Sequence, residues 1–168
     1  FTSNGTVFTY GGSSGFWSTI GYTANNISHR VVAGDFDQDG YEDDIAAFYD
    51  FGSSTSIHVW LSTGSSFVYQ LSTGWWNSTG YSASLITGRV VSVNWDRSNK
   101  LFDDIAVFYD YGGGQTRMHT FKSNGSQFIY SGGSGAWSSY GYTASQITGK
   151  VAAIDTRAGL DGGKVSDI

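Results

Sequence analysis

One short acidic stretch of the chain has the residue types and spacing to bind a metal ion. Asp35, Asp37 and Asp39 alternate along the sequence, and Gly40 permits a sharp bend after them. Carboxylates at alternate positions converge when the chain curls tightly, and Ca²⁺ takes about six to eight oxygen ligands. The sequence therefore predicts a calcium site formed by Asp35, Asp37, Asp39, the Tyr41 carbonyl and Asp43, with Asp44 as the alternative to Asp43. A solvated acidic turn is the other interpretation.

Two later stretches align with this one but have fewer acids. Asn94–Lys100 and Asp155–Asp161 each lose carboxylates and gain a cation, so we expect no strongly bound ion at either. An aspartate recurs before an apolar stretch in all three copies, at Asp44, Asp104 and Asp167. Such a residue commonly caps a turn by accepting backbone N–H groups, which is the alternative to a ligand role.

Aromatic and cationic residues recur with a spacing that suits carbohydrate. A tyrosine follows a tryptophan by about five residues in three copies, and a cation follows that tyrosine. Rings can pack on the apolar face of a sugar while polar neighbours bind its hydroxyls. The candidate sugar-binding residues are Trp17, Tyr22, Arg30, His58, Trp76, Tyr81, Arg89, His119, Trp137 and Tyr142. The competing interpretation is structural: rings that pack between neighbouring units, arginines paired with strand-end aspartates, and histidines that belong to strands.

The sequence favours a binding protein over an enzyme. It contains no Gly-x-Ser-x-Gly, no His-Glu-x-x-His and no phosphate-binding loop. The adjacent acid pairs at 43–44 and 103–104 face opposite sides of a strand, so neither pair can flank a glycosidic bond. An accessory region of a glycoside hydrolase is the alternative that keeps a link to catalysis.

These residues lie in a repeat of about sixty residues that must position them. Phe, Tyr, Val and Ile stretches separated by Gly, Ser and Asn predict four short strands in each full copy. The predicted strands are Arg30–Asp35, Ile45–Asp50, Ile57–Leu61 and Phe67–Leu71, then Arg89–Asn94, Ile105–Asp110, Met118–Lys122 and Phe128–Ser131. Further strands are expected within Phe1–Tyr10 and at Lys150–Asp155.

The predicted fold is all-β, a β-propeller of four-stranded antiparallel blades. A four-stranded unit cannot bury its own faces, and radial repetition covers them. We expect the end of one blade and a loop at 1–29, whole blades at 30–88 and 89–149, and the start of another blade at 150–168. Because propellers have about four to eight blades, other chains or the rest of a longer polypeptide are expected to close the ring.

Composition argues against several classes of partner and favours a secreted protein. The 168 residues carry a net charge of −5 without a basic cluster, which argues against nucleic-acid binding. No apolar run approaches the roughly 20 residues of a membrane span, and the absence of Cys excludes disulfides. The Ser, Thr, Gly and Tyr content is typical of a secreted binding protein.

The stretch Asp35-Phe-Asp37-Gln-Asp39-Gly40, followed by Asp43-Asp44-Ile45, resembles FG-GAP/VCBS-type propeller repeats. From His29 to Phe67, and more weakly from Arg89 to Phe128, the repeat plan is also similar to the seven-bladed lectins of the Psathyrella type. The resemblance implies a calcium loop and sugar sites in clefts between adjacent blades, with glycans or glycoproteins as partners. It would place Trp17, Tyr22 and Arg30 in one cleft, and Trp76, Tyr81 and Arg89 in the next.

Repeats of this type serve several functions, so the resemblance leaves alternatives open. A calcium-stabilised protein-interaction module, like the propellers of adhesion receptors, is one. An accessory domain of a secreted hydrolase is the other.

Overall fold

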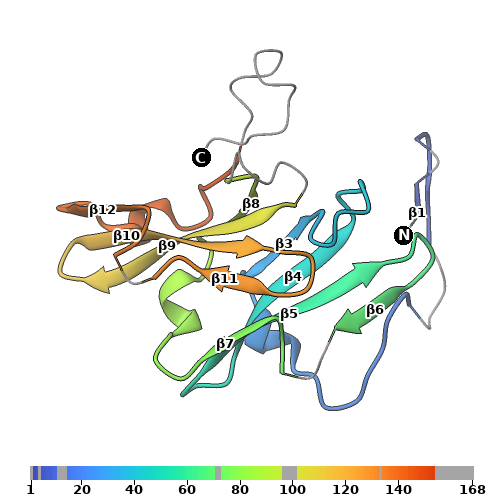
Figure 1. Cartoon of the computed structure of the whole chain (residues 1–168), viewed down its shortest axis with the longest axis horizontal. Coiled ribbons are helices and arrows are strands. Elements are labelled where there is room, and N and C mark those ends of the chain that lie inside the picture. The colour runs from blue at the N-terminus through green and yellow to red at the C-terminus, as the bar shows by residue number, and fades with distance from the viewer. Residues whose placement is uncertain are drawn as a thin grey trace.

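A computed structural model describes residues 2–3, 5–10, 15–70, 73–95, 102–132 and 134–153. In these parts of the chain the structure is all-β, as predicted. Two antiparallel sheets of about five strands each contain most of the strands, and a short hairpin lies at the N-terminus (Figure 1). Three 3-10 turns accompany the strands: η1 (Ala24–Ile27) precedes the first sheet, η2 (Ala83–Ile86) lies between the two sheets, and η3 (Ala144–Ile147) follows the second.

The first sheet has the strand order β3-β4-β5-β6, with β7 as a second partner of β5. Residues Val59–Ser62 of β5 pair with β6, and Thr55–Ile57 pair with β7, so two short strands share one edge. The strands are β3 (Val31–Gly34), β4 (Asp44–Asp50), β5 (Thr55–Ser62), β6 (Phe67–Gln70) and β7 (Trp76–Ser78).

The second sheet repeats this arrangement with the order β8-β9-β10-β11, and β12 pairs with β10. Its strands are β8 (Val90–Val93), β9 (Asp104–Gly112), β10 (Gln115–Ser123), β11 (Phe128–Tyr130) and β12 (Trp137–Tyr140). The registers also match: Ile45 lies opposite Trp60 in the first sheet, and Ile105 lies opposite Phe121 in the second. The sequence repeat is therefore a structural repeat, down to individual residue pairs.

All eight predicted strands of the two full copies are present, within a few residues at each end. The sequence prediction placed Trp76 and Trp137 in loops, whereas both lie on edge strands, β7 and β12. The prediction of a strand at Lys150–Asp155 is not met over 150–153, which form no strand, and its remainder lies outside the described residues.

The main hydrophobic core lies between the two sheets. One face of the first sheet contributes Phe48, Ile57 and Val59, and the facing side of the second contributes Ile105 and Phe121; all five are fully buried. The rings of Phe48 and Phe121 meet edge to face at 5.1 Å, an arrangement that aromatic pairs favour. We call the whole contact between these two sheet faces the inter-sheet joint.

Strands β3 and β8 approach each other closely along the joint. A Cβ atom on Gly34 would lie 2.6 Å from Ser92 Oγ and 2.7 Å from Asp103 Oδ2, so any larger residue would displace these side chains. Asp103 N donates to the Asp35 carbonyl at 2.7 Å, which adds a backbone bond between the two copies.

A row of backbone hydrogen bonds links the starts of successive copies. Gly88 N donates to the His29 carbonyl at 2.8 Å, and Gly149 N donates to the Gly88 carbonyl at 2.7 Å. All three residues have positive φ, 58° at His29, 70° at Gly88 and 71° at Gly149. Glycine adopts this conformation at little cost, whereas His29 is one of the uncommon non-glycine residues that do so.

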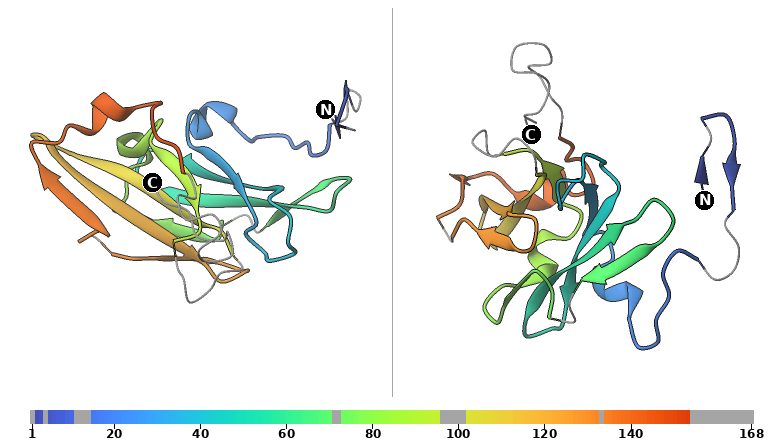
Figure 2. Two further views of the ribbon diagram at one scale, coloured as in Figure 1. Left: turned by 90° about the horizontal axis from the view of Figure 1, so that it is seen from above. Right: turned by 45° about the vertical axis from the view of Figure 1, so that its right-hand side comes forward.

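The N-terminal hairpin consists of β1 (Thr2–Ser3) and β2 (Phe8–Thr9) and stands away from both sheets (Figures 1 and 2). It confirms strands within the first ten residues. The two sheets pack side by side, and the described residues do not form a closed ring of blades. Among the described residues, no helix is long and apolar enough to cross a membrane.

Candidate functional site

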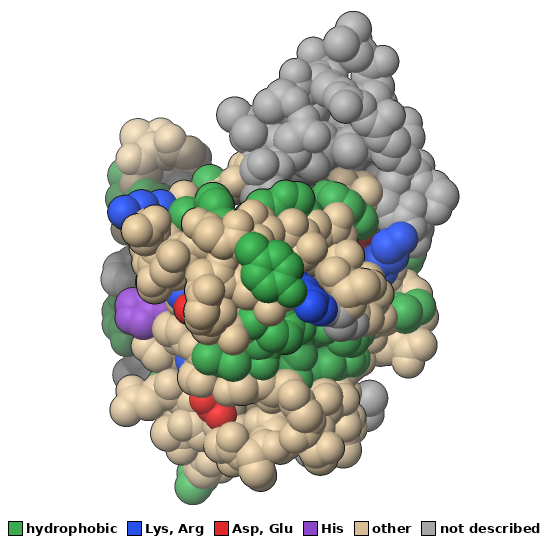
Figure 3. All heavy atoms as spheres, turned by 90° about the vertical axis from the view of Figure 1, so that its left-hand side faces the viewer, with side chains coloured by type: hydrophobic (Ala, Val, Ile, Leu, Met, Phe, Trp, Pro, Cys, Tyr) green, Lys and Arg blue, Asp and Glu red, His purple; other side chains and the backbone are tan. Residues whose placement is uncertain are grey.

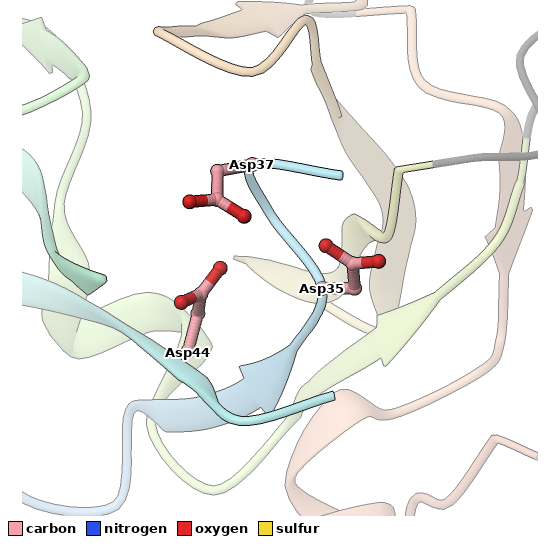
Figure 4. A group of neighbouring side chains, drawn as sticks. All are labelled: Asp35, Asp37 and Asp44. Carbon is pink, nitrogen blue, oxygen red and sulfur yellow. The ribbon is translucent and has the colours of Figure 1, made fainter. Parts of the chain in front are cut away.

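The acidic stretch brings three carboxylates together between β3 and β4. Asp35 follows the end of β3, Asp37 lies in the loop, and Asp44 is the first residue of β4. One carboxylate oxygen from each lies within 4.8 Å of the others, and Asp37 and Asp44 point toward one another (Figure 4). This partly buried cluster could hold a metal ion, because hard cations are bound by converging carboxylate oxygens.

Backbone N–H groups fix two of these carboxylates in place. Asp35 accepts from Gln38 N at 2.7 Å and from Gly40 N at 3.0 Å, which curls the loop around its side chain. Asp44 accepts from Phe36 N at 3.0 Å and from Ser62 N at 2.9 Å, which connects the loop to the end of β5. The carboxylates are therefore positioned before any ion binds.

Charging this cluster without a cation is unfavourable. Burial raises the pKa of Asp44 to about 6, although its two backbone hydrogen bonds oppose the shift. Burial also raises the pKa of Asp37, and the neighbouring carboxylates of Asp39, Asp35 and Asp43 add to the effect. A bound cation would reverse both shifts, because it favours the ionised carboxylates.

The other predicted ligands are arranged differently. The carboxylates of Asp39 and Asp43 lie outside the group of three, whose third member is Asp44, the alternative ligand. Asp39 accepts from Tyr41 N at 2.9 Å. Asp43 Oδ1 is buried and has no hydrogen-bond partner among the described residues.

In the second copy, Asp104 accepts from Ser123 N at 2.9 Å, as Asp44 does from Ser62, so the capping role is common to both. The parts of the two later loops at 96–101 and 155–161 lie outside the described residues, so the expectation of no strong ion there stays a prediction.

The recurring aromatic residues differ in exposure from copy to copy. Tyr81 is 7% exposed and packs with Trp76 inside the inter-sheet joint. Trp17 and Tyr22 are half-buried on the outer face of the first sheet. Trp137 and Tyr142 are each 40% exposed, on the far side of the second sheet, where hydrophobic side chains gather at the surface (Figure 3). Within the inter-sheet joint, Tyr81 and Trp76 therefore have a packing role, which is the structural interpretation given above.

The two strand histidines are almost fully buried, His58 3% and His119 1% exposed. Three tyrosine hydroxyls surround His119: those of Tyr81 and Tyr130 lie 3.2 Å from Nδ1, and that of Tyr111 lies 3.2 Å from Nε2. Burial lowers the pKa of His119 to about 4, so the ring is neutral at pH 7.

His58 is held less completely. Its Nδ1 lies 3.1 Å from the Tyr22 hydroxyl, whereas its buried Nε2 has no partner among the described residues. Phe51 stands where the second copy has Tyr111, and a phenyl ring cannot form that hydrogen bond. Burial lowers the pKa of His58 to about 4.

The arginines join successive copies together. Arg30 and Arg89 are each 6% exposed. Arg30 donates to the Phe48 carbonyl at 3.2 Å and to Thr87 Oγ1 at 2.7 Å, and Arg89 makes the corresponding bonds to the Phe108 carbonyl and Thr148 Oγ1. These hydrogen bonds hold each guanidinium group between one copy and the next, which indicates a structural role.

A shallow hollow of about 370 Å³ lies beside the β9–β10 turn and η2, and the sequence candidates did not include it. Tyr111 is 42% exposed there, with its hydroxyl fixed by His119 and the Arg117 guanidinium 4.7 Å from its ring. Asp110 lies next to it. The repeat of Tyr49-Asp50-Phe51-Gly52 as Tyr109-Asp110-Tyr111-Gly112 was a signal that could have identified this position. The lining residues are Leu85, Tyr109, Asp110, Tyr111 and Gly112.

The arrangement thus combines a carboxylate cluster, a neutral histidine network and one hollow in which an aromatic ring adjoins a carboxylate. We compared the chain with protein-family models, curated proteins and solved structures, and none of them matches it.

Proposed function

We propose that this protein is a secreted, carbohydrate-binding module of the lectin type, whose sheets are blades of a β-propeller. The hollow beside the β9–β10 turn carries the proposal. Small-molecule sites combine apolar surface with a few fixed polar groups, and this hollow offers the exposed Tyr111 ring beside the Asp110 carboxylate. Glycans and glycoproteins are the partners that this chemistry fits.

The Tyr111 ring is held in one orientation before a ligand arrives. Its hydroxyl lies 3.2 Å from His119 Nε2, and Arg117 covers part of the ring. Because the ring is already ordered, binding a sugar costs less conformational entropy than it would with a mobile side chain. Asp110 also lines this hollow, and its carboxylate accepts from Gly112 N at 2.8 Å, which fixes its position.

The propeller assignment is supported by two sheets that share one strand order and one register, and that pack side by side with their innermost strands adjacent. In propellers, blades are arranged in this way around an axis. Further blades would come from other chains or from the rest of a longer polypeptide.

Glycan binding is tested on a broad array with the intact chain, followed by affinity measurements on variants. We expect Tyr111→Ala and Asp110→Asn each to weaken binding at least tenfold. Phe51→Ala and Asp50→Asn change the corresponding positions of the first copy and serve as matched controls, with affinity unchanged. Absence of any glycan ligand, or equal loss in the controls, would refute a site in this hollow.

Calcium is the ion we propose for the Asp35, Asp37 and Asp44 cluster. Three converging carboxylates, two of them held in place by backbone N–H groups, suit a hard cation with many oxygen ligands. A ligand that binds only the folded state stabilises it, so we expect Ca²⁺ to raise Tm and EDTA to lower it. Asp37→Asn should abolish this response, whereas Asp50→Asn should retain it. A chelator that leaves Tm unchanged would argue against a bound ion.

A second candidate function is a calcium-stabilised protein-interaction module. The observation that favours it is the burial of Tyr81 and Trp76 in the joint, which assigns the recurring aromatics to packing. This alternative predicts a calcium-dependent Tm together with no glycan ligand on the array.

A further inference from the structure

The outer face of the first sheet carries an apolar hollow of about 430 Å³. It lies on the side of the sheet turned away from the inter-sheet joint, because its residues alternate along β4 and β5 with those that face the second sheet. Nearly all of its lining is hydrophobic, and an open apolar surface of this kind marks an interaction site. The lining includes Phe16, Tyr22, Ile27, Ile45, Trp60 and Phe67.

The second copy shows what covers such a surface. Its corresponding residues are Trp75, Tyr81, Ile86, Ile105, Phe121 and Phe128, and each is 7% exposed or less. They lie in the joint, under the face of the first sheet that presents Phe36 and Phe48. Phe48 meets Phe121 at 5.1 Å, and Phe36 meets Phe128 at 5.5 Å. The hollow therefore matches one half of the inter-sheet joint, and in the second copy the other half is the face of the first sheet that presents Phe36 and Phe48.

The residues around the hollow already have the geometry that their counterparts have in the inter-sheet joint. Phe67 N donates to the Phe16 carbonyl at 3.1 Å, as Phe128 N donates to the Trp75 carbonyl at 3.1 Å. Trp17 and Tyr22 meet at 5.4 Å and 89°, and Trp76 and Tyr81 meet at 5.2 Å and 87°. A surface that needs no rearrangement loses little entropy when it is covered.

The N-terminal hairpin repeats part of the same plan. In sequence, Ser3 and Phe8 correspond to Ser62 and Phe67, the end of β5 and the start of β6. Phe8 is 75% exposed, whereas its counterpart in the second copy, Phe128, is 3% exposed. An apolar position that is covered in the joint is therefore exposed in the hairpin.

We propose, resting on the propeller arrangement proposed above, that the outer face of the first sheet is a docking surface for one more sheet of this same repeat, packed as the first sheet packs on the second. Its second strand presents a phenylalanine equivalent to Phe48 over Trp60 and Ile45. Repeats of this kind bury their faces on one another, so each added sheet contributes an interface term to stability. An intact second copy of the chain fits less well, because its residues 135–149 would occupy the place of 15–29.

The fit is tested by extending the chain with its own sequence. Phe1 corresponds to Trp60, so a duplicate of residues 30–59 placed ahead of Phe1 supplies strands equivalent to β3, β4 and most of β5 in register. We expect the extended protein to show a higher Tm and a several-fold lower fluorescence of the dye 8-anilinonaphthalene-1-sulfonate, which binds exposed apolar surface. Phe48→Asp in the added segment alone is the matched control and should remove both effects.

A pair of variants in the unextended chain keeps the test informative if the extension folds poorly. Ile45 faces the hollow and Ile105 faces the joint, at the same position of the repeat. We expect Ile45→Asp to leave the fold intact and lower dye binding, and Ile105→Asp to unfold the protein. Equal effects of the two substitutions, or an extension that changes neither Tm nor dye binding, would overturn the proposal.

Discussion

The two full copies of the repeat have the same strands and register, yet they differ in how completely their polar and apolar groups are satisfied. In the second copy the face with Ile105 and Phe121 is covered, and His119 is surrounded by three hydroxyls. In the first copy the corresponding face is open, and Nε2 of His58 has no hydrogen-bond partner among the described residues. The first copy alone retains a full acidic loop. Two copies with similar backbones thus differ in their surfaces: the second copy is covered by the first, whereas the first has an uncovered apolar face and a carboxylate cluster that could hold an ion.

The largest expected contrast is between equivalent phenylalanines. Phe48 is fully buried in the complete joint, whereas Phe108 is half-buried on the far side of the second sheet. Deleting a buried Phe leaves a cavity, so Phe48→Ala should lower the free energy of unfolding by about 3–5 kcal/mol. Phe108→Ala should cost about 1–2 kcal/mol, since less surface is involved. Denaturant unfolding measures both losses of free energy. Equal losses would mean that Phe108 is covered as completely as Phe48.

Acid should destabilise the protein through its two buried histidines. Burial lowers the pKa of His58 and of His119 to about 4, below the unfolded value near 6.5. Between these pH values the unfolded chain binds more protons, so stability is full above about pH 6.5 and falls on the order of 1–3 kcal/mol per histidine down to pH 4. Asp44, with its pKa raised to about 6, has the opposite sign, because its protonation favours the folded state between about pH 6 and 4.

The histidine variants separate these contributions. His119→Phe and His58→Phe should each remove about half of the acid-dependent loss, measured as Tm between pH 7 and pH 4. Added calcium should weaken the opposing effect of Asp44 by keeping its carboxylate ionised. A Tm that is constant over this range in the unaltered protein would contradict neutral buried histidines.

The smallest effect comes from exchanging the residues that distinguish the two histidine sites. Tyr111→Phe removes the partner of His119 Nε2 and should cost about 1 kcal/mol. Phe51→Tyr offers His58 Nε2 a hydroxyl and should stabilise the protein by about 0.5–1.5 kcal/mol. Chemical denaturation measures both changes in the free energy of unfolding. Opposite signs would support the difference between the two histidine sites, and equal signs would contradict it.

The strands were predictable from the sequence because alternating β-branched and aromatic residues between Gly and Ser clusters are local signals. The edge strands β7 and β12 were missed because Trp76-Asn-Ser and its counterpart pair with β5 and β10 through contacts that are not local. The carboxylate cluster was predicted from spacing, but the choice of Asp44 depends on β5 delivering Ser62 N to it. The burial of Arg89 and His119 depends on the neighbouring sheet, which no window of sequence contains.

The backbone row through His29, Gly88 and Gly149 gives the stack of sheets a polarity. Each carbonyl in it points toward the following copy, so the peptide dipoles align, and the row has an amide end at His29 and a carbonyl end at Gly149. Units built on this row can be added only head to tail. A further copy that continued this row would donate its own amide to the Gly149 carbonyl.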